Sequence, residues 1–288
     1  MAEASARNPM KHGRWAVALI IGPVAIPQGI NVKVPHPARV YDCWLGGKDN
    51  FAADRLAAAE AIQIFPKTVE SAQSCRAFLS RVVRYLTAGA GIRQFLDIGS
   101  GLPSAQNVHE VAQKIAPESR VVYVDNDPIV MLHARALLAS CPEGATGYVQ
   151  ADIRDPETIL AKAAETLDFS RPVAIMLLAM LHFVSDAQDP AGIIRTLMDA
   201  VPRGSYLAIG HHTADIYPEM REFARRMSEL NPDFTATLRD KKQVTGLFAG
   251  LDIVTPGVVQ ISKWRPDSEA GALAAAALWG GVARKLRQ

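Results

Sequence analysis

The stretch Phe95-Leu96-Asp97-Ile98-Gly99-Ser100-Gly101-Leu102-Pro103 decides the fold. It begins as a short apolar strand and ends in two glycines, which permit a tight turn and let a ligand approach the backbone closely. Asn107 and Glu110 follow at the spacing of a capping box, which predicts the start of a helix. Because ligands of open α/β sheets bind at the carboxyl ends of strands, this turn is the first candidate site.

Short β-rich runs alternate with helical stretches after this motif. The predicted strands are 94–97, 120–125, 147–150, 173–178 and 205–210, and the predicted helices are 105–115, 128–139, 157–166, 192–200 and 218–230. Continuously apolar strands are typical of a parallel sheet covered by helices on both faces. In residues 251–261, two β-rich runs joined by Pro256-Gly257 predict an antiparallel hairpin. The fold class is therefore α/β, a Rossmann-like doubly wound sheet.

The N-terminal third divides into two parts. The apolar run 15–30 is too short for a membrane helix of about 20 residues, and Gly22, Pro23 and Pro27 interrupt it. We expect residues 1–33 to be either a loosely ordered leader or a stretch absent from the native protein because the start codon is placed too far upstream. Residues 51–88 carry apolar side chains at helical spacing, which predicts a helical N-terminal extension. Residues 34–288 are then one domain, with a helical lid over 34–90 and an Ala-rich helix over 268–288.

The amino-acid composition limits which binding partners and which cellular compartment we expect for the protein. The 288 residues are 49% hydrophobic, and 31 basic against 29 acidic residues leave a net charge of +2. No basic stripe is present, so we expect neither a nucleic acid nor a membrane as partner. Cys43, Cys75 and Cys141 are scattered, which indicates a reducing, cytoplasmic location and argues against a metal site.

Two classes of cofactor compete for the turn after the first strand. A dinucleotide fingerprint needs a third glycine, and Ser104 stands in its place. Asp97 precedes the glycines, where a carboxylate would repel a pyrophosphate but attract the sulfonium and ammonium of S-adenosylmethionine. The charge therefore favours S-adenosylmethionine and disfavours an NAD-dependent oxidoreductase.

Acidic residues also end the next two strands. Asp125 ends the second strand, where a carboxylate accepts hydrogen bonds from ribose hydroxyls. Asp152 follows the third strand and could accept from the adenine amine, while Ile153 packs on the base. Any one of these acids could be a solubilising turn residue, but three in order at strand tips point to a single ligand.

Asp97-x-Gly99-x-Gly101, Asp125 and Asp152 resemble the cofactor motifs of class I S-adenosylmethionine-dependent methyltransferases. More closely, the chain resembles an actinobacterial S-adenosyl methyltransferase family formerly known only as a domain of unknown function. The resemblance covers about residues 34–288, and its closest stretches are 35–54, 95–103, 107–110, 122–128, 256–259, 264–267 and 280–285. The first 33 residues match nothing in the family.

The resemblance implies a seven-stranded sheet whose last strand is antiparallel. It also implies a cofactor site made of Asp97, Ile98, Gly99, Ser100, Gly101, Asp125, Asn126, Asp152 and Ile153. Two residues depart from the usual patterns. Pro103 replaces the third glycine of the broad class, although Gly-Leu-Pro is expected in this family. Cys43 stands where the family more often has an aromatic residue, which could alter the pocket.

Several residues carry a functional and a structural interpretation. His182, after the fourth strand, is the best candidate for a general base, or it lines the pocket or caps a helix. Tyr41, Trp44 and Lys48 are predicted on one helical face, either as a lid or as packing. Gly46-Gly47 suits close approach to a ligand or a helix C-cap. His211-His212 has structural or substrate-side roles.

The sequence thus predicts an S-adenosylmethionine-dependent methyltransferase acting on a small molecule. No Asn/Asp-Pro-Pro-Tyr/Phe sequence follows the fourth strand, so a nucleobase amine is disfavoured as the acceptor. The alternative is a non-catalytic S-adenosylmethionine-binding regulatory or scaffold protein, because no unmistakable base is present. The Ala-rich C-terminal segment either packs on the domain or forms a homodimer contact.

Overall fold

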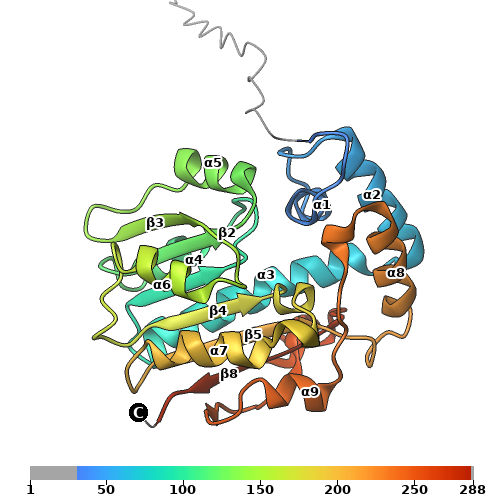
Figure 1. The fold of residues 1–288 in the computed structure, drawn as a ribbon. Coiled ribbons are helices and arrows are strands. Elements are labelled where there is room, and N and C mark those ends of the chain that lie inside the picture. The colour runs from blue at the N-terminus through green and yellow to red at the C-terminus, as the bar shows by residue number, and fades with distance from the viewer. Residues whose placement is uncertain (1–30, 287–288) are drawn as a thin grey trace, which may run out of the picture. The chain divides into compact units, whose positions relative to one another are not determined.

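The protein is described by a computed structural model that covers residues 31–286, apart from the side chain of Leu137 (Figure 1). The predicted leader therefore lies outside the described residues, except for its last three positions. The described strands are β1 (Gln94–Ile98), β2 (Arg120–Asp125), β3 (Ala145–Gln150), β4 (Ala174–Leu178), β5 (Tyr206–His212), β6 (Asp252–Ile253), β7 (Val259–Gln260) and β8 (Leu278–Arg284). The described α-helices are α1 (Pro37–Trp44), α2 (Ala52–Ile64), α3 (Thr68–Arg84), α4 (Val108–Gln113), α5 (Pro128–Leu137), α6 (Pro156–Ala163), α7 (Pro190–Asp199), α8 (Met220–Leu230), α9 (Lys241–Gly246) and α10 (Glu269–Leu273).

The strands form one eight-stranded sheet in the order β3-β2-β1-β4-β5-β8-β6, with β7 also paired to β8. Strands β1 to β5 are parallel, and β8 runs antiparallel to β5. The order of the strands reverses between β1 and β4, because β2 and β3 lie on one side of β1 and β4 and β5 lie on the other. Ligands of doubly wound sheets bind at this reversal point. The predicted α/β class and the positions of the five parallel strands are confirmed.

Helices cover both faces of the sheet (Figure 1). On one face, Leu96 and Ile98 belong to a core that includes Ile159 of α6, Ile194 of α7 and Val244 of α9. Successive side chains of a strand point to opposite faces, so Asp97 points to the other face, toward α3. The charged side chain of Asp97 therefore lies on the face of the sheet that α3 covers.

The Ala-rich C-terminal segment does not form the helix predicted over 268–288. The helix α10 has only five residues, and β8 lies between β5 and β6 within the sheet. A Cβ on Gly280 would lie 3.0 Å from the Ile209 carbonyl oxygen of β5 and 2.5 Å from the Ile261 side chain. Close packing and strand pairing here override the helix propensity of the alanines.

The predicted hairpin over 251–261 is also wrong in its pairing. The strands β6 and β7 do not pair with each other, because each pairs with a different part of β8. Ile253 lies opposite Ala283, and Val259 lies opposite Gly280. Residues 254–258 therefore bridge two positions along one strand, and the sheet has eight strands where seven were expected.

The three N-terminal helices α1, α2 and α3 do not pack together as one unit. The helices α1, α2 and α8 pack around Val40, Ala61 and Met227, and we call these three helices the cap. In contrast, α3 packs on the sheet, where Arg81 donates from Nε to the Trp264 carbonyl oxygen and Ser74 donates to that of Ala275. The segment predicted as a lid is thus divided between the cap and the helical layer.

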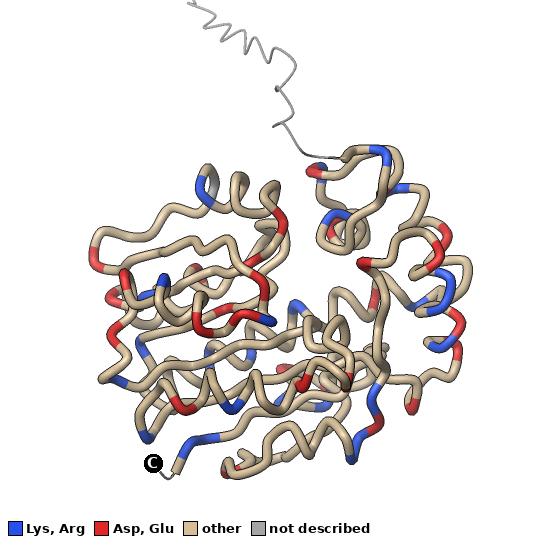
Figure 2. The backbone as a smooth tube through the Cα atoms, viewed as in Figure 1, with Lys and Arg blue, Asp and Glu red and all other residues tan. Residues whose placement is uncertain are grey.

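No helix within residues 31–286 is long and apolar enough to cross a membrane. Basic and acidic residues are interspersed along the chain in the view of Figure 2.

Candidate functional site

The glycine turn after β1 is pressed against the neighbouring strand tips. The N–H groups of Gly99 and Ser100 donate to the Val124 carbonyl oxygen at 2.8 and 3.1 Å. Gly99 has φ +77°, and a Cβ there would lie 2.8 Å from the Met180 Cβ after β4. Only glycine accommodates both this backbone conformation and this approach.

Asp125 organises the second strand tip. Its Oδ2 accepts from the Gly101 N–H at 2.9 Å and its Oδ1 from the Asp127 N–H at 3.0 Å. Burial raises the pKa of this carboxyl, while the two backbone donors oppose the shift. A carboxylate has about four lone-pair positions, so two remain for other donors. Asp125 can thus hold the glycine turn and a bound hydroxyl together.

Asp97 is buried, with 5% of its surface exposed, yet no described residue hydrogen-bonds to its carboxylate. Burial raises its pKa to about 7, the charge of Asp125 adds to the shift, and Arg76 opposes it. The guanidinium Nη2 of Arg76 is occupied by the carbonyl oxygens of Ala105 and Gln106. The arrangement leaves an unpartnered acid where a cation would compensate its burial.

Two buried hydroxyls beside the turn also lack partners. The Oγ atoms of Ser100 and Ser104 have no hydrogen bond within the described part of the chain. Buried polar groups are nearly always paired, so these atoms indicate a missing polar ligand. A ligand that carries both a cationic amine and hydrogen-bonding oxygens fits Asp97 and the two serines.

The third predicted acid is less available. Asp152 is paired with the guanidinium of Arg154, at 2.7 Å to Nε, and this pair lowers the pKa of Asp152. Ile153 is 3% exposed and belongs to the core. Asn126 and Asp152 line a groove of about 710 Å³ along the edge strand β3, which the other predicted cofactor residues do not reach.

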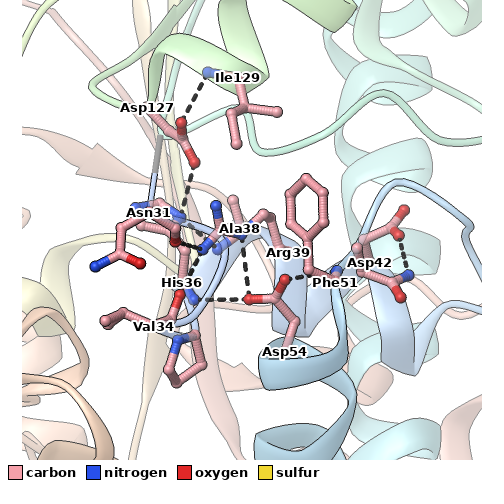
Figure 3. A network of polar contacts seen from close by, with 12 residues as sticks. Asn31, Val34, His36, Ala38, Arg39, Asp42, Phe51, Asp54, Asp127 and Ile129 are labelled. Carbon is pink, nitrogen blue, oxygen red and sulfur yellow. Dashed lines mark hydrogen bonds and ion pairs between the residues drawn. The ribbon is translucent and has the colours of Figure 1, made fainter. Parts of the chain in front are cut away.

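A polar network joins the cap to the tip of β2 (Figure 3). Asp127 caps α5 through Oδ1, and its Oδ2 lies 3.0 Å from Nδ1 of His36, the residue at the N-cap position of α1. The same Nδ1 lies 3.4 Å from the Ala38 N–H. One ring nitrogen cannot accept from Ala38 and donate to Asp127 at once. The shorter contact, and the otherwise unpartnered Oδ2, favour donation to Asp127.

Asp54 holds the cap end of this network (Figure 3). It is fully buried, and its Oδ1 accepts from the His36 N–H at 2.9 Å and from Arg39 Nε at 3.1 Å. Its Oδ2 accepts from the Phe51 N–H at 2.8 Å. A second contact joins the cap to α5, since Nδ1 of His133 lies 3.4 Å from Oδ2 of Asp49. The cap is therefore fastened beside Asp125.

The sequence did not single out His36, Asp54 or Asp127 as site residues. A local signal was present, because His36-Pro37 and Asp127-Pro128 both show a capping residue before a proline at the first helical position. That signal predicts two helix starts, but it does not show that the two caps face each other.

The predicted face of Tyr41, Trp44 and Lys48 is only partly correct. The helix α1 ends at Trp44 with Leu45 as its C-cap, Gly46 follows in the left-handed conformation with φ +77°, and Lys48 lies beyond the helix. Tyr41 and Trp44 point inward, and their side chains donate to the carbonyl oxygens of Ala72 and Ala58.

The three histidines predicted near strand ends lie together. His182 is 6% exposed, and its ring centroid lies 4.6 Å from that of His212 and 6.2 Å from that of His211. Nε2 of His211 lies 2.9 Å from Nη1 of Arg239, which is always a donor, so His211 is held as a neutral acceptor. Within the described residues, no three His, Cys, Asp or Glu side chains are grouped to hold a metal.

Comparisons with known proteins identify the family of the chain. The sequence pattern of the S-adenosyl methyltransferase family matches residues 24–286. The match begins ten residues before the predicted domain, so part of the predicted leader belongs to the family region. None of the curated proteins compared with the chain matches it.

Solved structures give the same result. A DUF574 family protein from Streptomyces avermitilis MA-4680 is 45% identical, with 88% of this chain and 98% of that chain covered and a TM-score of 0.85. A candidate methyltransferase from Thermobifida fusca YX is 42% identical over 92% of this chain and all of that chain, with a TM-score of 0.82. The plantazolicin methyltransferase BpumL, solved with SAH, shares only the fold, at 13% identity, coverage of 87% and 96%, and a TM-score of 0.51. The chain belongs to the S-adenosyl methyltransferase family, and it is an S-adenosylmethionine-dependent methyltransferase.

Proposed function

We propose that the protein transfers the methyl group of S-adenosylmethionine to a small molecule. The observation that carries the proposal is the buried, unpartnered carboxylate of Asp97 beside the glycine turn. S-adenosylmethionine supplies an electrophilic methyl group on a sulfonium. The chain then has to bind this cation, orient it and keep water away from the reacting atoms.

Each predicted residue has a distinct role in the proposed site. Asp97 attracts the cationic amino-acid end of the cofactor, and Ser100 of the glycine turn offers a hydroxyl that has no partner among the described residues. Asp125 accepts from the ribose hydroxyls. Asn126 and Asp152 stand near the adenine, where Arg154 competes for Asp152. Ile98, Gly99, Gly101 and Ile153 shape the backbone and core beneath.

Calorimetric titration with S-adenosylmethionine, its demethylated product and NAD tests the cofactor site. We expect the first two to bind and NAD not to bind. Incubation with cofactor labelled on the methyl group and a metabolite extract then tests transfer. Label in a small-molecule product supports an enzyme, whereas binding without transfer across broad extracts favours the regulatory alternative. Binding of NAD alone would sink the proposal.

The affinity for S-adenosylmethionine should depend on pH. Asp97 holds a proton with a pKa of about 7 in the ligand-free protein, and the cationic cofactor binds the ionised form. Binding therefore releases a proton, and affinity should rise by about tenfold per pH unit below pH 7 and level off above it. Titrations between pH 5.5 and 7.5 measure this slope.

The variant Asp97→Asn is the control for the pH dependence. It keeps the shape of the side chain but cannot ionise, so its affinity should be low and nearly independent of pH in this range. A slope that persists in Asp97→Asn would assign the titration to another group.

A further inference from the structure

A second, smaller cavity lies beyond the tips of β4 and β5, between the cap and α3. It is lined by aromatic side chains from three elements, Tyr41 and Trp44 of α1, Phe65 after α2 and Phe223 of α8. Ala179 and His212 supply its wall at the strand tips. Because Met180, next to Ala179, touches the glycine turn, the cavity adjoins the proposed cofactor site.

The chemistry of the wall is uniform. None of its lining residues is Asp, Glu, Lys or Arg. Its hydroxyl groups are already engaged, since Tyr41 donates to the Ala72 carbonyl oxygen, Thr68 donates to that of Phe65 and Ser71 accepts from the Ala277 N–H. Among the lining residues, only His212 has a buried side-chain nitrogen without a hydrogen-bond partner in the described chain.

We propose that this cavity is the acceptor site, that its substrate is an uncharged aromatic molecule with a hydroxyl group, and that His212 receives the hydroxyl proton. The inference rests on the proposed methyl transfer and adds the acceptor class and the base. Aromatic walls favour a flat ring through stacked and edge contacts. A carboxylate or ammonium on the acceptor would be buried without a partner here, which is costly.

The reaction step is balanced by one proton transfer. The acceptor oxygen forms a bond to the methyl carbon as the bond between that carbon and sulfur breaks. The sulfur leaves as a neutral thioether, and the hydroxyl proton passes to the unprotonated ring nitrogen of His212. The positive charge of the sulfonium thus ends on the imidazolium, which later loses the proton to water.

The surroundings of His212 keep its ring unprotonated in the resting protein. Burial lowers its pKa to about 4, so the ring is neutral near pH 7, and the Ala277 carbonyl opposes the shift. Among the other titratable groups, Tyr41 and Cys75 line the same cavity, His182 packs against the His212 ring, and His211 contacts Arg239. His182 packs against the His212 ring but does not line the cavity, so it is a positioning residue in this arrangement.

The cavity is closed in this conformation. Its volume of about 20 Å³ has room for roughly one water molecule. The rings of Trp44 and Phe223 meet across it, with centroids 6.0 Å apart. Binding of an aromatic acceptor therefore requires the rings of Trp44 on α1 and Phe223 on α8 to move apart.

Binding of three matched probes tests the acceptor class. Calorimetry in the presence of the demethylated cofactor compares 2-naphthol with 2-naphthoate and 2-(aminomethyl)naphthalene, which carry a negative and a positive charge on the same ring. We expect 2-naphthol to bind at least about tenfold more tightly than either charged probe. Absence of 2-naphthol binding, or equal binding of a charged probe, overturns the acceptor class.

Methylation of 2-naphthol by labelled cofactor tests the base. His212→Asn and His212→Gln each place an amide group near the position of one of the two ring nitrogens. Neither amide can take up a proton. We expect kcat to fall by about 100-fold or more while 2-naphthol and the cofactor still bind. The decrease in kcat caused by His182→Asn should be at least tenfold smaller than that caused by either His212 variant. Binding without formation of the methyl ether, or full activity of both His212 variants, overturns the assignment.

Failure here is distinguishable from failure of the proposed function. A protein that binds S-adenosylmethionine and labels a charged metabolite keeps the function and loses the inference. A protein that does not bind S-adenosylmethionine loses both.

Discussion

Replacing Asp125 by alanine is expected to weaken S-adenosylmethionine binding by roughly 100-fold. In the proposed site, two ribose hydroxyls would lose a charged acceptor. Each such hydrogen bond contributes about 1.5 kcal/mol or more, and a total of about 3 kcal/mol corresponds to roughly 100-fold in affinity. The Gly101 N–H also loses its acceptor, so the glycine turn is no longer held in place. Calorimetric titration of the variant measures the change.

The fold should survive this substitution. The two backbone N–H groups left without an acceptor cost about 1–3 kcal/mol each, against a typical total stability of about 5–15 kcal/mol. Asp125→Asn keeps one carboxyl-like oxygen and should fall between the wild type and Asp125→Ala. Asp168→Ala changes an exposed acid beside Gln94, at the end of β1 opposite the glycine turn, and should leave binding unchanged. An unaltered dissociation constant for Asp125→Ala would show that another residue holds the ribose.

Asp54→Ala should produce the largest loss of stability among the site variants. It removes one partner of a buried ion pair, which typically costs about 3–5 kcal/mol because the other charge stays buried. Arg39 and the N–H groups of His36 and Phe51 all lose their acceptor. Unfolding in urea measures the free energy, and limited proteolysis shows whether α1 and α2 open first.

Two comparisons separate the charge from the packing. Arg39→Met combined with Asp54→Leu removes both charges and should recover much of the stability lost by Asp54→Ala. Glu222→Ala breaks an exposed ion pair with Arg225 on α8 and should have no measurable effect. A double variant that is no better than Asp54→Ala would mean that the pair stabilises the cap chiefly through its hydrogen bonds to the backbone.

The parallel half of the fold could be predicted because its signals are local. The strand that ends at Asp97 and the one that ends at Asp125 are short apolar runs, and the glycine turn follows directly. The helix after Asn107 begins with the capping box that its spacing predicts. In these places backbone preference, burial and turn chemistry all agree.

The family resemblance predicts an antiparallel last strand, which β8 confirms, but the position of this strand could not be predicted from local signals because it depends on distant partners. The alanines before β8 favour a helix locally, and only pairing with β5 makes Leu278–Arg284 a strand. The cap has the same origin, since α8 joins α1 and α2 from far along the chain. The candidate base shows the same limit. The place of His182 after β4 favoured it in the sequence, whereas the folded chain places His212 in the wall of the cavity.

The position of β8 has a consequence for how the chain is made. Residues 213–277 separate β5 from the strand that covers its free edge. During synthesis, β5 therefore leaves the ribosome with a row of unpaired backbone groups along one edge. These groups stay unpaired until β8 has been synthesised. Exposed strand edges of this kind pair readily with other chains. We expect the nascent protein to depend on chaperones during this interval, and chains cut short before β8 to aggregate.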